Sequence, residues 1–141
     1  MMIESETYAL RPIGIVRSSL RAIHDAPNQA FEGAPEAFLD IDPAFADAFL
    51  RVTPGRDLIL LTWLDRARRD VLQVHPMSDT SIPLTGVFAT RSPDRPNPIG
   101  LHRVTVIGIV PPTGLRVRAL EVIDGTPILD LKAVMEQSRD E

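Results

Sequence analysis

A run of three prolines within six residues constrains the fold of this chain more than any other feature. Pro93, Pro96 and Pro98 lie in the segment Ala89–Leu101, whose sequence is ATRSPDRPNPIGL. Each proline fixes its own φ angle and keeps the residue before it out of the helical region. The segment is therefore predicted to be a stiff, extended loop, and a helix is excluded at this point in the chain.

Proline occurs thirteen times in the 141 residues, about twice its average frequency of roughly 5 %. Proline and glycine together still make up only about 15 % of the chain, well below the roughly 25–30 % that is typical of low-complexity disorder. The length and the 44 % of apolar residues suit one folded domain. We therefore expect a single domain over residues 1–141.

Charge and composition exclude several classes of function. The chain has no cysteine, which excludes disulfides, thiol nucleophiles and cysteine–zinc sites. A net charge of −4 argues against a general nucleic-acid binder, although a local basic patch can still hold RNA. The acidic segment Met1–Glu6 does not resemble a secretion signal, and no apolar stretch approaches the roughly 18 residues of a membrane span. We expect a cytoplasmic protein without a membrane segment.

The apolar runs are short, rich in β-formers and separated by turn residues at intervals of about ten, which predicts an all-β barrel or sandwich. Strands are predicted at Ala9–Ser18, Phe38–Ile41, Leu58–Leu64, Val71–His75, Leu84–Ala89, Leu101–Val110, Leu115–Val122 and Ile128–Ala133. One helix is predicted after Asp42, because this residue can cap it, Pro43 suits its first position and Pro54 with Gly55 would end it.

The proline-rich loop is the first candidate binding site. It presents Arg91, Arg95 and Asn97 on a backbone that has little entropy left to lose when a ligand binds. The planar fork of an arginine suits a carboxylate or a phosphate. A structural interpretation is equally open, in which the prolines stabilise a crossover and the arginines pair with acids such as Asp94.

Residues Asp124–Pro127 form the second candidate, after a predicted strand that carries Glu121. The sequence is typical of a tight turn. Alternatively, a carboxylate from this segment faces the Arg91 loop and completes a pocket there.

Two further segments carry weaker signals. Gln29, in the loop segment Ala26–Gln29, could recognise the edge of a heterocycle. Trp63 is expected in the core at the end of a strand, whereas Asp65 and Arg66 follow at its rim. These two charged residues fit either ligand contacts or a surface ion pair that contributes little to stability.

The sequence indicates no metal site and no Rossmann nucleotide site. His24, His75 and His102 are too far apart for a local metal motif, so each is expected at the surface or at a strand end. A Gly-x-Gly-x-x-Gly segment is absent.

Residues Ala89–Leu101 resemble the hallmark of the TsaA-like family, also called YaeB or TrmO, which is Ala-Thr-Arg-Ser-Pro-x-Arg-Pro-Asn-Pro-Ile-Gly-Leu. Three further segments resemble the family in the same order. Ile13–Ser18 is similar to its opening strand, Pro27-x-Gln29 to the following loop, and Asp124–Lys132 to its closing segment.

The resemblance spans about residues 9–132, the expected core of the domain, and leaves residues 135–141 as a tail expected to be flexible. It implies a mainly β fold, a small antiparallel β-barrel with one short helix, which acts as a homodimeric methyltransferase of non-Rossmann type. The implied cofactor is S-adenosylmethionine. The implied substrate is tRNA, methylated at N6 of threonylcarbamoyl-adenosine beside the anticodon.

Residue by residue, the resemblance also implies a site. The cofactor would be surrounded by Gln29, Ala30, Asp65, Arg66, Arg91, Leu101, Leu120, Glu121, Val122 and Asp124. Substrate contacts are expected from Arg95, Asn97, Thr126 and Lys132. No catalytic residue is assigned, because methyl transfer depends mainly on an aligned approach of the two reacting atoms.

The chain departs from the family pattern at a few positions. Arg56 and Asp57 stand where the family usually has Ser-His, and Asp65 stands where it often has His. These differences leave two alternatives open. One is the same cofactor with a different methyl acceptor, and the other is a non-catalytic module that binds S-adenosylmethionine.

Overall fold

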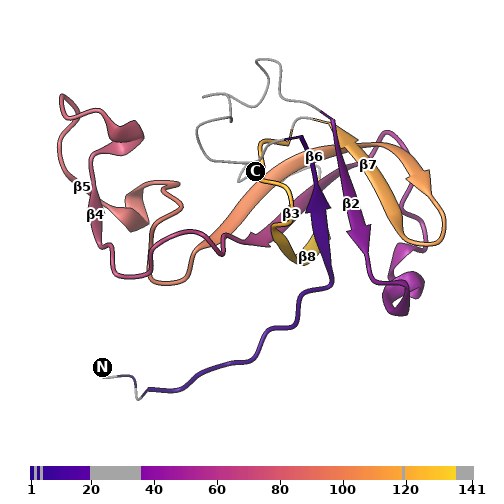
Figure 1. Cartoon of the computed structure of the whole chain (residues 1–141), viewed down its shortest axis with the longest axis horizontal. Coiled ribbons are helices and arrows are strands. Elements are labelled where there is room, and N and C mark those ends of the chain that lie inside the picture. Colours follow the sequence, from indigo (N-terminus) through magenta and orange to yellow (C-terminus); the bar gives the residue numbers. More distant parts are fainter. Residues whose placement is uncertain (2, 4, 20–35, 119, 136–141) are drawn as a thin grey trace.

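The computed structural model describes residues 1, 3, 5–19, 36–118 and 120–135. Its main element is a six-stranded antiparallel barrel with the strand order β1-β2-β7-β6-β3-β8 (Figure 1). The barrel closes because β1 pairs with β8, through Gly14 with Ile128 and Ile15 with Pro127. The predicted mainly β, barrel-type fold is thus confirmed.

The barrel strands differ greatly in length. They are β1 (Gly14–Arg17), β2 (Ala37–Ile41), β3 (Asp57–Trp63), β6 (Ile99–Val110), β7 (Gly114–Arg118) and β8 (Pro127–Ala133). The strand β6 is the longest, and it pairs with β3 along one part and with β7 along the other.

The core follows from strand alternation. On β3, Leu58, Leu60 and Thr62 are buried, while the residues between them are partly exposed. The inward positions of β6 include Val104 and Val106, which are also buried. Aliphatic residues of all six strands and of the segment between β7 and β8 form one cluster: Val16, Ala37, Leu39, Ile41, Leu58, Leu60, Val104, Val106, Leu115, Val117, Leu120, Val122 and Ile128. Burial of each large aliphatic side chain is worth about 1.5–3 kcal/mol, so this cluster stabilises the barrel.

The segment between β7 and β8 is tied to β1. Gly125 adopts a φ of +87°, which favours glycine, and its N–H donates to the Val16 carbonyl at 2.7 Å. The Val16 N–H donates in turn to the Thr126 carbonyl at 2.9 Å. The Ser18 hydroxyl donates to the carbonyl of Val122 at 2.6 Å. These bonds fix the position of the residues that precede β8.

Residues 64–98, called the arm below, leave the barrel after β3 and return into β6. They contain the two-residue strands β4 (Gln73–Val74) and β5 (Thr85–Gly86) and the 3₁₀ turns η3 (Pro76–Ser78) and η4 (Val87–Ala89). Figure 1 shows β4 and β5 standing away from the barrel, and they pair only with each other. Within the arm only Val87 and Pro98 are buried, so the arm has almost no hydrophobic core.

The predicted helix is confirmed as the short 3₁₀ segment η2 (Pro43–Phe49), which ends earlier than expected. Asp42 caps it as predicted, because its carboxylate accepts a hydrogen bond from the Ala44 N–H at 2.9 Å. Phe45 has non-helical backbone angles, and its ring and that of Phe49 pack against the core. These two rings hold the segment against the barrel core.

Several predicted strands were too long. Those expected at Val71–His75 and Leu84–Ala89 shrink to two residues each, because they have no barrel strand to pair with. The first strand begins at Gly14, and β7 ends at Arg118. Trp63 was predicted in the core but is only half-buried, with the Arg69 guanidinium 5.2 Å from its ring centre.

Two expectations concern the chain as a whole. In the described part of the chain, no helix is long and apolar enough to cross a membrane. The tail predicted to be flexible falls mainly on residues 136–141, which lie outside the described residues.

Candidate functional site

A cavity of about 650 Å³ lies where the arm meets the barrel. Its volume is within the range of about 300–1,000 Å³ that is common for small-molecule sites. Four parts of the chain line it: the first residues after β3, the β4–η3 tip of the arm, the proline-rich loop, and the segment between β7 and β8. The lining residues are 64–67, 74–78, 90–94 and 121–123, together with His102 and Thr126.

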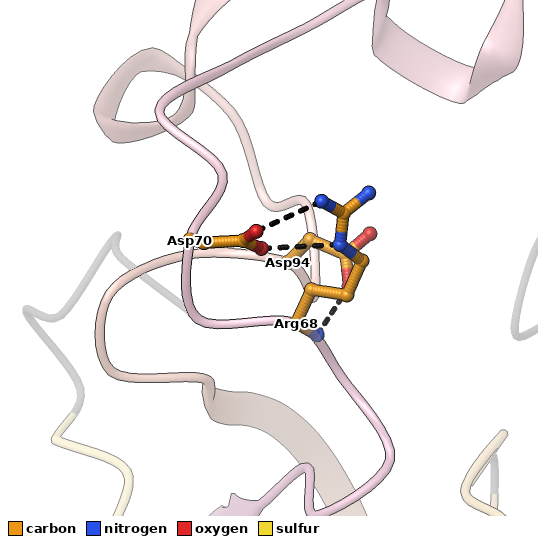
Figure 2. A network of polar contacts seen from close by, with 3 residues as sticks. All are labelled: Arg68, Asp70 and Asp94. Carbon is orange, nitrogen blue, oxygen red and sulfur yellow. Dashed lines mark hydrogen bonds and ion pairs between the residues drawn. The ribbon is translucent and has the colours of Figure 1, made fainter.

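The two ends of the arm are joined by hydrogen bonds beside this cavity. The Leu64 N–H donates to the Pro98 carbonyl at 2.8 Å, and the Arg95 N–H donates to the Arg68 carbonyl at 3.1 Å. The Arg68 N–H donates to the Asp94 carboxylate at 2.9 Å (Figure 2). The proline-rich loop and the segment after β3 thus form one bonded unit.

Figure 2 also shows an exposed ion pair on the same unit. The Nε and Nη2 atoms of Arg68 donate to the two carboxylate oxygens of Asp70 at 3.1 and 3.0 Å. The hydrogen bonds from Arg68 lower the pKa of the Asp70 carboxyl group below its usual range. Both side chains are largely exposed to solvent, so the pair is expected to contribute little to stability.

Arg69 makes a second link between the two segments. Its Nε donates to the Pro96 carbonyl at 2.7 Å, and its Nη2 donates to the Asn97 side-chain oxygen at 2.8 Å. Its guanidinium also lies over Trp63, as described above. Asn97, predicted as a substrate contact, therefore has an intramolecular partner.

Arg95 is held by the backbone of its own loop. Its Nε donates to the Ser92 carbonyl at 2.7 Å, and its Nη2 donates to the carbonyls of Val87 and Thr90, both at 2.8 Å. Arg95 thus fits the structural interpretation of the loop, in which its arginines form bonds within the protein. The acceptors are backbone carbonyls rather than the predicted carboxylates. Arg95 stiffens the backbone on both sides of Arg91.

Arg91 differs from Arg95 although it lies in the same loop. It lines the cavity and is exposed. Within residues 36–118 and the other described segments, it forms no hydrogen bond or ion pair. Its guanidinium is therefore available for a carboxylate or another anion in the cavity.

Carboxylates reach the cavity from two sides. Asp65 follows β3, and Glu121 lies in the segment after β7. The Oε1 atom of Glu121 is buried. Negative charge in a partly desolvated place stabilises a nearby cation more strongly than it would in water. The cavity therefore offers separate positions for an anionic and a cationic group of one ligand.

His102 lines the barrel side of the cavity. It lies on β6, and its Nε2 is 3.0 Å from the Thr62 hydroxyl oxygen on β3. Burial lowers the pKa of His102 to about 4, so the ring is neutral at physiological pH. The expectation of a surface or strand-end position was wrong for this histidine.

Some predicted site residues lie away from the cavity lining. Leu101 is 38 % exposed on β6, at a position that alternates with the inward His102. Leu120 is fully buried in the core. Asp124 accepts a hydrogen bond from the Ser18 N–H at 3.0 Å. Lys132 lies on β8 and forms an ion pair with Asp130 at 3.1 Å.

Arg95 and Asn97, described above, are not part of the cavity lining either, and the remaining predicted residues divide into two groups. Asp65, Arg66, Arg91, Glu121, Val122 and Thr126 all line the cavity. Thr126 is buried there, and its hydroxyl donates to the Ile123 carbonyl at 2.7 Å. Gln29 and Ala30 lie outside the described residues.

Residues 15–140 match the family model of the tRNA-methyltransferase O N-terminal domain. The chain belongs to this family. It is 41 % identical over 123 residues to an S-adenosyl-L-methionine-binding protein of Archaeoglobus fulgidus, with 87 % of this chain and 86 % of that protein covered. It is 38 % identical over 129 residues to a probable S-adenosyl-L-methionine-binding protein of Methanothermobacter thermautotrophicus, with 90 % of each covered.

Solved structures of TrmO are similar in fold. The crystal structure of TrmO from Pseudomonas aeruginosa matches with a TM-score of 0.75 at 27 % sequence identity, and the match covers 96 % of this chain and 61 % of that one. The present chain therefore spans about three-fifths of the TrmO chain that it matches. The predicted resemblance to the TsaA-like or TrmO family is confirmed.

Two positions that depart from the TrmO family pattern lie in different places. Asp57 is away from the cavity, where its carboxylate accepts hydrogen bonds from the Thr105 hydroxyl at 2.7 Å and from Arg103 Nε at 3.0 Å. These bonds lower the pKa of Asp57. Asp65 lines the cavity. Of the two, only Asp65 is placed to change what the cavity binds.

Sequence reasoning missed His102 and the tip of the arm. A signal for His102 was available, because it shares the period-two spacing of Val104 and Val106, which are buried. Met77 and Ser78 line the cavity with φ angles of +56° and +57°, in a region that non-glycine residues rarely adopt. No glycine or Asn-Gly pair marks this turn in the sequence, so it could not be predicted locally.

Proposed function

We propose that this protein is an S-adenosylmethionine-dependent methyltransferase that modifies tRNA, with N6 of threonylcarbamoyl-adenosine beside the anticodon as its acceptor. The observation that carries the proposal is a single cavity into which Arg91 of the family motif and two carboxylates converge. Membership of the TrmO N-terminal domain family and the names of the relatives support it. A tRNA substrate also implies a cytoplasmic location.

The side chains in the cavity fit this cofactor. Its amino-acid carboxylate suits the guanidinium of Arg91 or Arg66, and its ammonium and sulfonium charges suit Asp65 and Glu121. The faces of its adenine base are flat and apolar, which suits the apolar lining residues Leu64, Val74 and Val122. Gln29, Ala30, Leu120 and Asp124 remain part of the proposed binding set.

The proposed role of the chain is to bind and align. When bound, the cofactor supplies an electrophilic methyl group. Methyl transfer then requires that the acceptor nitrogen approach in line, and holding two groups in such a geometry lowers the barrier substantially. The clamp that Arg95 makes on its own loop holds Arg91 in place before the ligand arrives, so little conformational entropy is lost on binding. Arg95, Asn97, Thr126 and Lys132 remain proposed substrate contacts.

We also propose that the protein acts as a homodimer. An apolar surface follows the outward positions of β3 and β6, where Leu61 pairs with Leu101 and Trp63 pairs with Ile99. Ile99 and Leu101 are 43 % and 38 % exposed. Exposed apolar patches mark interaction surfaces. Leu101 faces away from the cavity of its own chain, so it can contribute to cofactor binding only in the cavity of a second copy.

Calorimetry with S-adenosylmethionine and with its demethylated product tests the cofactor. We expect saturable binding, and the Kd to rise about tenfold or more in Arg91→Ala, because a charge-assisted hydrogen bond is lost. Arg118→Ala is the matched control, since this arginine is exposed on β7 outside the cavity lining. Absence of binding in the unmodified protein would refute the proposed function.

Transfer assays identify the acceptor. tRNA is prepared from cells with and without the threonylcarbamoyl modification, and we expect methyl transfer only to the modified tRNA. Transfer to both preparations, or to another substrate alone, would favour the alternative of a different acceptor. Cofactor binding without turnover on any substrate would favour a non-catalytic binding module.

Sedimentation analysis tests the dimer. We expect a dimer for the unmodified protein and a monomer for Leu101→Glu. Ile109→Glu is the matched control, because Ile109 lies on the same strand with the same exposed fraction of 38 %. If Leu101→Glu sediments as the unmodified protein does, this surface is not the interface.

A further inference from the structure

The barrel side of the cavity contains a histidine–threonine pair that the proposed binding set does not include. His102 and Thr62 meet across the strands β6 and β3, with Nε2 and Oγ1 3.0 Å apart. Gly100 pairs with Thr62 in the register, and a Cβ at Gly100 would overlap both of these atoms. The absence of a side chain at this position leaves the space in which the imidazole ring and the hydroxyl group lie.

The surroundings of Thr62 decide which atom donates. Thr62 is fully buried, so its hydroxyl hydrogen needs an acceptor within the protein. Among the described residues, the only partner of its oxygen is Nε2 of His102. If Nε2 carried the ring proton, the buried hydroxyl hydrogen would have no acceptor, which is unfavourable. The hydroxyl therefore donates to Nε2, and the neutral ring carries its proton on Nδ1.

The Nδ1–H group is then a hydrogen-bond donor of the cavity. His102 is a lining residue, and Nε2 is turned toward Thr62, so Nδ1 is the polar atom left for a ligand. Within the described residues, Nδ1 has no hydrogen-bond partner. The low pKa given above keeps the ring neutral, so this donor adds no positive charge to the site.

The chemistry of the cavity indicates which part of the ligand this donor contacts. Arg91 suits the carboxylate of the cofactor, and Asp65 and Glu121 suit its cationic groups. A neutral donor in a cavity whose lining includes the apolar residues Leu64 and Val122 suits an uncharged acceptor instead. The uncharged acceptors of S-adenosylmethionine that lie in a flat, apolar framework are the ring nitrogens of its adenine.

We propose that His102, held by Thr62 in the Nδ1–H form, donates a hydrogen bond to an adenine ring nitrogen of the cofactor and makes the cavity selective for that base. This inference rests on the function proposed above. It assigns His102 as a specificity residue and Thr62 as a residue that positions it.

The ring proton can be located without any ligand. Long-range ¹⁵N–¹H spectra of the full chain distinguish the two neutral forms of a histidine. The chain has three histidines, so His102→Asn identifies the signals of His102. We expect the proton on Nδ1 in the unmodified protein and a shift toward the Nε2–H form in Thr62→Val, which keeps the size of the side chain but removes the hydroxyl. A proton on Nε2 in the unmodified protein, or no change in Thr62→Val, overturns the proposal.

Calorimetry with modified ligands tests the contact itself. Three analogues of S-adenosylhomocysteine are used, each with one adenine ring nitrogen replaced by carbon at position 1, 3 or 7. We expect one analogue to bind the unmodified protein about tenfold more weakly than the parent compound, as the loss of one buried hydrogen bond implies. That analogue and the parent should bind His102→Leu equally, because the donor is absent.

A second variant controls for damage to the fold. His102→Asn places an amide N–H near the position of Nδ1, so it should bind the parent compound within about threefold of the unmodified protein. If His102→Leu binds the parent compound as tightly as the unmodified protein does, the inference fails and the proposed function stands. If the unmodified protein binds none of the compounds, the proposed function fails with it, whereas the spectra still decide the state of the Thr62–His102 pair.

Discussion

The barrel and the arm are stabilised by different interactions. Among the described residues, buried aliphatic side chains of the barrel strands and of the segment between β7 and β8 form one cluster. In the arm, only Val87 and Pro98 are buried, and polar links such as those of Arg68, Arg69 and Arg95 connect its segments. The free energy of unfolding should therefore depend mainly on the barrel, and the shape of the cavity mainly on the arm.

Two arginines that lie only a few positions apart in the arm also differ in their contacts. Arg95 is bonded to three carbonyl groups of the arm, whereas Arg91 faces the cavity. One arginine maintains the loop and the other is available to a ligand. A region with little hydrophobic core can thus present charged groups in fixed positions, because prolines and hydrogen bonds replace burial.

Replacing a central barrel residue should have the largest effect. Leu60 is fully buried on β3, and Leu60→Ala should lower the free energy of unfolding by about 2–5 kcal/mol, because a cavity remains in the core. Urea titration measures the change. Leu84→Ala in the arm is the matched control, since Leu84 is 54 % exposed and should change stability by less than about 0.5 kcal/mol. Equal losses in the two variants would contradict the comparison.

Lowering the pH should decrease the free energy of unfolding, because His102, at the boundary between the barrel and the arm, binds a proton more readily in the unfolded chain. Its pKa is about 4 in the folded protein and has a reference value of 6.5, so the unfolded chain binds more protons between these pH values. The part of the folding stability that depends on a neutral His102 is fully present above pH 6.5 and is lost as the pH falls toward 4. The loss amounts to about 3 kcal/mol of the free energy of unfolding. Urea titrations across this range measure it. His102→Asn should remove this part of the slope, and an unchanged slope would show that His102 is not its source.

Removing the hydrogen bonds that Arg95 makes within the arm should destabilise the arm but not the barrel. Arg95→Ala removes three hydrogen bonds to carbonyl groups and should destabilise the loop by about 1–3 kcal/mol. Hydrogen exchange should become faster for amides of residues 87–95 and remain unchanged in β3 and β8, because the barrel core is intact. Arg91→Ala is the control in the same loop and should leave the exchange rates as they are. Faster exchange throughout the barrel would mean that the two regions unfold together.

The smallest effect is expected at the exposed ion pair of the arm. Asp70→Asn weakens the contact with Arg68 shown in Figure 2, and we expect no measurable change in the unfolding midpoint at neutral pH. Because the pKa of Asp70 is lowered in the folded state, any contribution is present above its usual value of 3.8 and is lost below it. Thermal unfolding at pH 7 checks the expectation. A shift as large as that of Arg95→Ala would show that the exposed pair maintains the arm.

Several residues that line the candidate cavity could be picked out from the sequence, because the motif around Arg91 is contiguous. Arg91 is recognisable within its proline-rich run and Asp65 by its place after a predicted strand, and both line the cavity together with Glu121. The alternation of apolar residues likewise predicted the β-fold, and Asp42 predicted the start of η2. The lengths of β4 and β5 could not be predicted, because a strand extends only where another strand lies beside it.

The sequence by itself determined a mainly β fold, a stiff arginine-bearing loop and a resemblance to a family of small β-barrels. These features depend on spacing, backbone angles and motifs that span about a dozen neighbouring residues. Only the tertiary structure decided that Arg95 is bonded to its own loop while Arg91 lines the cavity, that Leu101 faces outward, and that His102 meets Thr62. Each of these outcomes depends on strand register, barrel closure or hydrogen bonds across a folded loop, and no pattern within one segment specifies where another segment will lie.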